Sequence, residues 1–200
     1  PASQADALER LHALLLACPN ARGEAPVMTV GVILETADRD AMRAAAPDTY
    51  IAARLDDPRH ATLLAALRRG AAARVFDLQL HGLAHYWPPT LMSLAAADSE
   101  VRAWLAAPDL GWTEDLPSPL QSRWCDARRL PSAPLPAAAI NDAATAEVVA
   151  WQSLFNAPPA VAVPTTFIWN ETVERAWSAA GVRAIVTPGS RHEGRGADGR

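Results

Sequence analysis

Two histidines four positions apart are the residues of this sequence best suited to chemistry. His81 and His85 lie in the run LHGLAH, directly after a segment that alternates like a β-strand. Neutral imidazole nitrogens are good ligands for zinc and similar divalent ions. Side chains four residues apart on a helical turn lie on one side of it. The spacing therefore predicts that His81 and His85 bind a divalent metal ion, with zinc the favoured ion.

Two ligands do not complete a metal site, and the chain holds five histidines, so an HxxxH pair can also arise by chance. The two rings would then be hydrogen-bonding groups at the end of a strand. A bound metal ion could activate water, polarise a carbonyl or hold structure, so the pair alone leaves the reaction open. The sequence has no GxSxG, GxxxxGK[ST] or GxGxxG motif, so neither a serine nucleophile nor a nucleotide site is supported.

The elements that must position the histidines alternate between helices and strands. Apolar spacing predicts helices at 5–17, 58–69, 93–106, 142–156 and 171–180, and strands at 26–34, 75–80, 160–164 and 182–187. We expect Ser3 to cap the first helix and Gly70 to end the second. Strands that alternate with helices indicate an α/β fold with mostly parallel strands, in a sheet or a barrel. Such folds place their active sites at the carboxyl ends of the strands, where the histidines lie.

Length and composition predict one α/β domain spanning residues 1–200, with a Pro-rich, loop-rich excursion at about 108–136. The net charge of −4 and the lack of a basic stripe argue against a nucleic-acid partner. The apolar stretches fall short of the roughly 20 residues that a membrane-spanning helix needs, so we expect no membrane partner. The first residues lack a signal-peptide pattern, which favours the cytoplasm. The chain has no initiator Met, and we expect it to be a fragment of a longer protein.

The HxxxH run resembles the second motif of the polysaccharide deacetylases, the NodB-type family, in which an H-x-x-x-H segment supplies two metal ligands. The order of helix and strand before it is also similar to that family. Further along, the run VPTTF at 163–167 falls near the family's R-x-P-aromatic segment, although Val161, Ala162 and Val163 offer no arginine there.

This resemblance implies a partial, distorted (β/α) barrel that binds a divalent metal through His81 and His85, with Pro164 and Phe167 in the wall of the substrate cleft. It implies a metal-dependent hydrolase that removes acetyl groups from an N- or O-acetylated carbohydrate, acting on a carbon–nitrogen bond other than a peptide bond in the N-acetyl case. The family's aspartate ligand and aspartate base are expected on a strand before Pro1, outside this chain, and its late Leu-x-His motif is missing. The alternatives are a non-catalytic carbohydrate-binding or structural relative, and an unrelated metal-free α/β domain.

Overall fold

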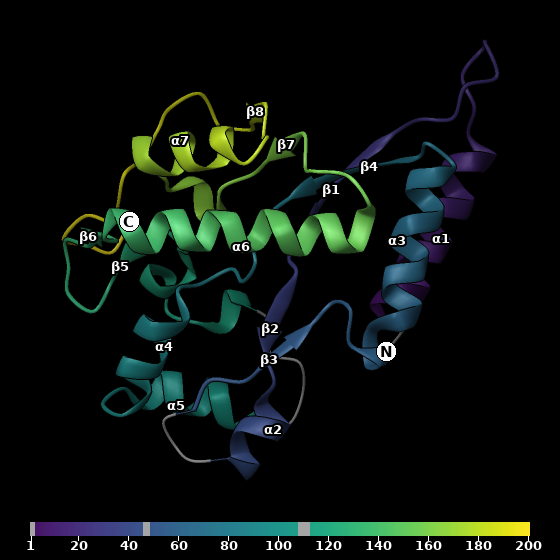
Figure 1. Ribbon diagram of the computed structural model, residues 1–200. Helices are drawn as coiled ribbons and strands as arrows, with labels where there is room; N and C mark the ends of the chain where they lie inside the picture. The colour runs from purple at the N-terminus through teal and green to yellow at the C-terminus, as the bar shows by residue number, and fades with distance from the viewer. Residues whose placement is uncertain (1–2, 46–48, 108–112) are drawn as a thin grey trace.

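A four-stranded parallel sheet forms the centre of the molecule. The computed structural model describes residues 3–45, 49–107 and 113–200. The strands are neighbours in the order in which they occur in the chain (Figure 1): β1 (Met28–Val32), β4 (Phe76–Leu80), β7 (Val161–Ala162) and β8 (Ala184–Ile185). The α/β class and the parallel strands predicted from the sequence are therefore confirmed. These four strands are compatible with a partial barrel and do not by themselves establish one.

The first two helices predicted from the sequence, α1 (Gln4–Ala17) and α3 (Ala61–Ala72), pack against each other at one end of the sheet. A capping box begins α1, as the Oγ of Ser3 accepts from the backbone N–H of Asp6 and the Asp6 carboxylate accepts from the Ser3 N–H. A 3-10 turn, η1 (Pro58–His60), precedes α3.

Gly70 does not end α3, contrary to the prediction. The helix continues to Ala72, and Gly70 is buried in it. A Cβ at this position would lie only 1.9 Å from Cδ2 of the Phe76 ring. The glycine is therefore required by the close approach of an aromatic ring from β4, and the chain needs no special backbone conformation there.

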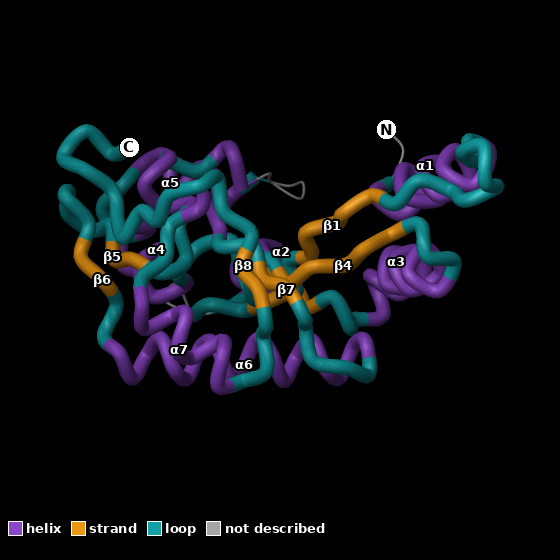
Figure 2. Tube along the Cα trace, turned by 90° about the horizontal axis from the view of Figure 1, so that it is seen from above, coloured by secondary structure: helices purple, strands orange, loops and turns teal. Residues whose placement is uncertain are grey.

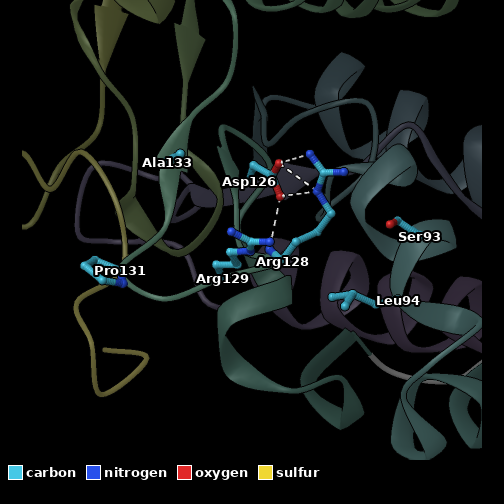
Figure 3. A pocket seen from close by; sticks show the side chains of 7 residues that line it. All are labelled: Ser93, Leu94, Asp126, Arg128, Arg129, Pro131 and Ala133. Carbon is cyan, nitrogen blue, oxygen red and sulfur yellow. Dashed lines mark hydrogen bonds and ion pairs between the residues drawn. The ribbon is translucent and has the colours of Figure 1, made fainter.

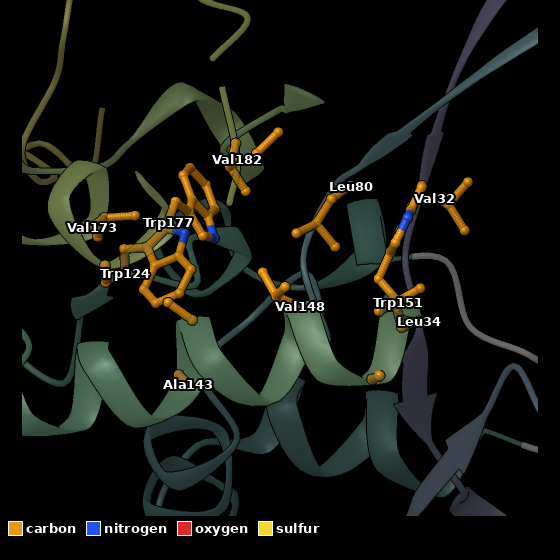
Figure 4. Packing of buried hydrophobic residues seen from close by; sticks show 14 of the residues in the cluster. Val32, Leu34, Leu80, Trp124, Ala143, Val148, Trp151, Val173, Trp177 and Val182 are labelled. Carbon is orange, nitrogen blue, oxygen red and sulfur yellow. The ribbon is translucent and has the colours of Figure 1, made fainter. Parts of the chain in front are cut away.

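The helices α6 (Ala137–Phe155) and α7 (Glu171–Ala179) lie together on one side of the sheet (Figure 2). Both were predicted, although α6 begins before the expected Asp142. Their inner faces join the main core, where Trp124 and Trp177 meet edge to face with ring centroids 5.5 Å apart (Figure 4). The tryptophans serve mainly as core residues, because five of them are buried: Trp104, Trp124, Trp151, Trp169 and Trp177.

The helix predicted at 93–106 is two helices, α4 (Pro88–Ala95) and α5 (Ser99–Ala106). The Asp98 carboxylate accepts from the backbone N–H groups of Glu100 and Val101, which starts α5 as a separate helix. Neither strand of the antiparallel ribbon formed by β2 (Glu35–Ala37) and β3 (Ala52–Arg54) was predicted; α2 (Arg39–Ala44) lies between these two strands.

The described part of the Pro-rich excursion is irregular, as predicted, but it packs into the protein. It contains η2 (Thr113–Asp115), η3 (Ser118–Gln121) and the short hairpin of β5 (Cys125–Asp126) and β6 (Ala133–Pro134); residues 108–112 of the prediction lie outside the described residues. Six of its described apolar side chains are buried: Leu116, Leu120, Trp124, Cys125, Ala127 and Leu135. Across the described residues, no helix combines the length and apolarity that crossing a membrane requires.

Candidate metal centre

His81 lies where three neighbouring strands of the sheet end. It follows β4 directly, and its backbone N–H donates to the carbonyl of Val32, the last residue of β1, at 3.0 Å. Its side-chain Nδ1 is 2.8 Å from the carbonyl oxygen of Val163, which follows β7. A carbonyl oxygen can only accept, so Nδ1 carries the proton and Nε2 keeps its lone pair. This tautomer leaves Nε2 of His81 available as a metal ligand.

The rings of His81 and His85 face each other edge to face, with centroids 5.1 Å apart and an interplanar angle of 73°. They do not lie on a helical turn, as the spacing had predicted, but in an irregular loop that contains Gly82, whose φ of +111° is unfavourable for other residues. The structure therefore brings the two sequence-predicted ligands together at the carboxyl end of the parallel sheet.

Nδ1 of His85 is buried and has no hydrogen-bond partner among the described residues. Such a nitrogen can take a metal ion or a water molecule as its partner, and Nε2 of His12 is buried without a partner in the same way. This orphaned atom beside the free Nε2 of His81 fits a metal ion.

Both imidazoles are held in the neutral form that binds metals. Burial lowers the pKa of His81, partly offset by its bond to the Val163 carbonyl. Burial, and then the proximity of His81, lowers the pKa of His85 to about 4. Near neutral pH both rings therefore carry a free lone pair without having to lose a proton.

Acidic side chains are present near this end of the sheet, but they do not join the pair. Glu114 in η2 is close enough to His85 for its charge to oppose the lowering of the His85 pKa. Glu35 in β2 is half-buried, and its burial raises its pKa, whereas Arg123 and Arg54 lower it. Within residues 3–45, 49–107 and 113–200, no group of three or more His, Cys, Asp or Glu side chains is arranged to hold a metal ion. The described residues thus offer only two candidate ligands, His81 and His85.

The two residues predicted to line a substrate cleft differ in exposure. Pro164 is buried and precedes the turn η4 (Thr165–Phe167), whereas the Phe167 ring is 38 % exposed. Thr166 and Phe167 both have positive φ angles, 52° and 55°. Strained backbone of this kind persists only where the surroundings hold it in place. Contact of these residues with a substrate stays a prediction.

Two residues that the sequence analysis did not select hold this region together. Glu147 of α6 accepts from the backbone N–H of Leu83, inside the histidine loop, at 3.0 Å and from Nε of Arg123 at 3.2 Å. The backbone N–H of Arg123 in turn donates to Oγ1 of Thr165 at 2.9 Å. Arg123 and Glu147 therefore link α6, the histidine loop and the strained turn.

A signal for Glu147 was present in the sequence, because it lies at helical spacing from Ala143 and Trp151 on the apolar face of α6. An acidic residue in such a stripe needs a buried partner. The partner could not be foreseen, since Arg123 comes from the irregular Pro-rich segment.

Comparison of the chain with protein-family models, with curated proteins and with solved structures finds no match.

Proposed function

We propose that this chain forms part of a metal-dependent hydrolase of the polysaccharide deacetylase type, which removes acetyl groups from an N- or O-acetylated carbohydrate. One observation carries the proposal: Nδ1 of His81 donates to the Val163 carbonyl, which leaves Nε2 free beside His85. A metal-binding histidine commonly donates its second nitrogen to a carbonyl or carboxylate in this way. The location of the pair at the carboxyl ends of parallel strands adds support.

The residues present fit a divalent ion, with zinc the natural choice for two neutral imidazoles. His81 and His85 would be two of its ligands. Once bound, the ion would polarise an acetyl oxygen and activate a water molecule. The resemblance to the deacetylases places a third ligand, an aspartate, on another strand. The edge of β1 has a parallel partner on one side only among the described strands, β4, so its other edge is where such a strand would pair.

The chain's own residues would shape the substrate side of this site. Phe167 presents a partly exposed ring, a surface that suits the apolar face of a sugar. The family resemblance calls for an arginine near Pro164, and Arg123 is a buried arginine beside that turn, since it donates to Thr165. Its guanidinium pairs with Glu147, so we assign it to holding the turn and the histidine loop in place.

The first test is the metal content of the protein, measured by elemental analysis after dialysis against zinc and then against buffer. The sample should contain any segments that flank residues 1–200 in the natural protein. We expect about one zinc ion per chain and its loss in the His81→Ala/His85→Ala variant. His192→Ala is the matched control, because His192 is exposed and far along the chain from the loop. Equal zinc in the double variant, or none in the wild type, would reject the metal site.

The second test separates a hydrolase from a non-catalytic relative. The zinc-loaded protein is incubated with chitin oligosaccharides and with acetylated xylo-oligosaccharides, and the released acetate is measured. Release by the wild type but not by the double variant supports the hydrolase. Zinc binding with no acetate from either substrate would leave the carbohydrate-binding relative, and saturable binding of the same oligosaccharides would then identify it.

A further inference from the structure

A pocket with a volume of about 510 Å³ lies outside the histidine site, between α4 and the β5–β6 hairpin (Figure 3). Ser93 and Leu94 of α4 line one side of it, and Pro131 and Ala133 line the opposite side. Its size is within the range of small-molecule sites, and its walls are partly apolar.

Three charged side chains complete the pocket: Asp126, Arg128 and Arg129. Two guanidinium groups against one carboxylate leave one positive charge in excess. The carboxylate of Asp126 accepts hydrogen bonds from Nε of Arg128, at 2.9 and 3.0 Å, and from Nη2 of Arg128 at 2.6 Å. It also accepts one from Oγ1 of Thr90 at 3.2 Å. Arg128 and Asp126 therefore neutralise each other in a fork-to-fork pair.

Arg129 supplies the excess charge. Its exposed side chain makes no hydrogen bond or ion pair with the part of the chain that the structure describes, in contrast to its neighbour Arg128. A guanidinium presents a planar set of donors that matches the two oxygens of a carboxylate or the oxygens of a phosphate. Beside an apolar wall, such a group favours a ligand that combines an oxyanion with an apolar part.

The pocket is built on a restrained loop. The hairpin pairs Cys125 with Pro134 and Asp126 with Ala133, which fixes both ends of the segment that carries the arginines. Two hydrogen bonds also join Ser132 to Arg195. The backbone N–H of Ser132 donates to the carbonyl of Arg195 at 2.9 Å, and the backbone N–H of Arg195 donates to Oγ of Ser132 at 2.7 Å. A restrained loop loses little conformational entropy when it binds a ligand.

We propose that this pocket binds a small ligand that carries a carboxylate or a phosphate, with Arg129 as the group that holds the oxyanion. The proposal is independent of the histidine site, since neither His81 nor His85 lines the pocket.

Calorimetric titration of the whole protein with inorganic phosphate and, separately, with benzoate tests this. We expect saturable binding of at least one probe, and a loss of affinity of at least about tenfold in Arg129→Gln, because the charge-assisted contact is removed. Arg183→Gln is the matched control, since it removes the same charge from an exposed arginine outside the pocket and should bind as the wild type does. Unfolding curves of both variants should match that of the wild type.

The two probes also distinguish the possible ligands, because tighter binding of phosphate indicates a phosphorylated ligand and tighter binding of benzoate an apolar carboxylate. The proposal is overturned if neither probe binds at concentrations up to about 10 mM, or if Arg183→Gln weakens binding as much as Arg129→Gln does.

Discussion

Arg123 and Glu147 form an ion pair that is almost completely shielded from water, with side chains 3 % and 0 % exposed and a distance of 3.2 Å from Nε to Oε2. Glu147 also accepts from Nε1 of Trp177 and from the backbone N–H of Leu83. Burial raises the pKa of Glu147, and the charge of Arg123 opposes this shift. The pair is therefore a structural tie to the histidine loop.

Removing one member of this pair should destabilise the protein strongly. Glu147→Ala leaves Arg123 buried without its counter-charge, and we expect a loss of about 3–5 kcal/mol in the free energy of unfolding, measured by chemical denaturation. Arg175→Ala, which breaks an exposed pair with Glu171, should cost about 0.5 kcal/mol or less.

A double variant tests whether the buried charge causes that loss. Arg123→Met/Glu147→Leu removes both charges and keeps apolar volume. Its loss in the free energy of unfolding should be smaller than the sum of the losses in the single variants Arg123→Met and Glu147→Leu. Simple additivity would show that lost packing, rather than an unpaired charge, explains the effect.

The close contact between Gly70 and the Phe76 ring predicts that Gly70→Ala destabilises the protein, although alanine is the better helix former. The added methyl group would overlap the ring, and we expect a cost of about 1–3 kcal/mol. Thermal unfolding of Gly70→Ala, Phe76→Leu and the double variant measures the coupling. The double variant should be more stable than additivity predicts, because a leucine side chain leaves room for the methyl group. Additive losses would show that overlap with the Phe76 ring does not cause the destabilisation by Gly70→Ala.

The low pKa of His85 predicts that acid destabilises the metal-free protein. The folded state takes up the proton only near pH 4, whereas the unfolded chain takes it up near its ordinary value of 6.5. Unfolding therefore binds a proton between these values, and the free energy of unfolding should fall by about 1–3 kcal/mol as the pH drops from 6.5 to 4.

The comparison that isolates this group is His85→Gln, measured by urea denaturation across the same pH range in the presence of a chelator. Its stability should fall less steeply than that of the wild type, because the titrating ring is gone. Parallel pH profiles would contradict the lowered pKa of His85.

The buried hydroxyl of Thr165 should contribute measurably to the stability of the protein. Its hydroxyl accepts from the backbone N–H of Arg123, and the side chain is only 1 % exposed. Thr165→Val keeps the shape but leaves that N–H unpaired, so we expect a loss of about 1–3 kcal/mol in denaturation experiments. Thr62→Val, at an exposed position of α3, should change stability by less than about 0.5 kcal/mol. A similar change in both variants would show that the hydrogen bond contributes nothing measurable.

The periodic parts of the fold were predictable because each is determined by its own residues. Ser3 and Asp6 define the start of α1, and the apolar run at 26–34 contains β1. Predictions failed where a residue type depends on a contact with a distant part of the chain. Gly70 was expected to end a helix, but it is a glycine because the Phe76 ring of β4 packs against it. The ribbon of β2 and β3 is too short to show a period, and its pairing is supplied by the backbone of the partner strand.

The sequence by itself determined that His81 and His85 follow a strand closely, because this order is a local property of the chain. The helical turn expected between them was wrong, since residues 81–86 form an irregular loop in which Gly82 has a φ of +111°. Only the tertiary structure decided the state of the two rings. The Val163 carbonyl that sets the tautomer of His81 comes from the residue that follows β7, and Arg123 and Glu147 come from segments far along the chain. Burial lowers both histidine pKa values, and burial is a property of the packed molecule, which no local pattern encodes.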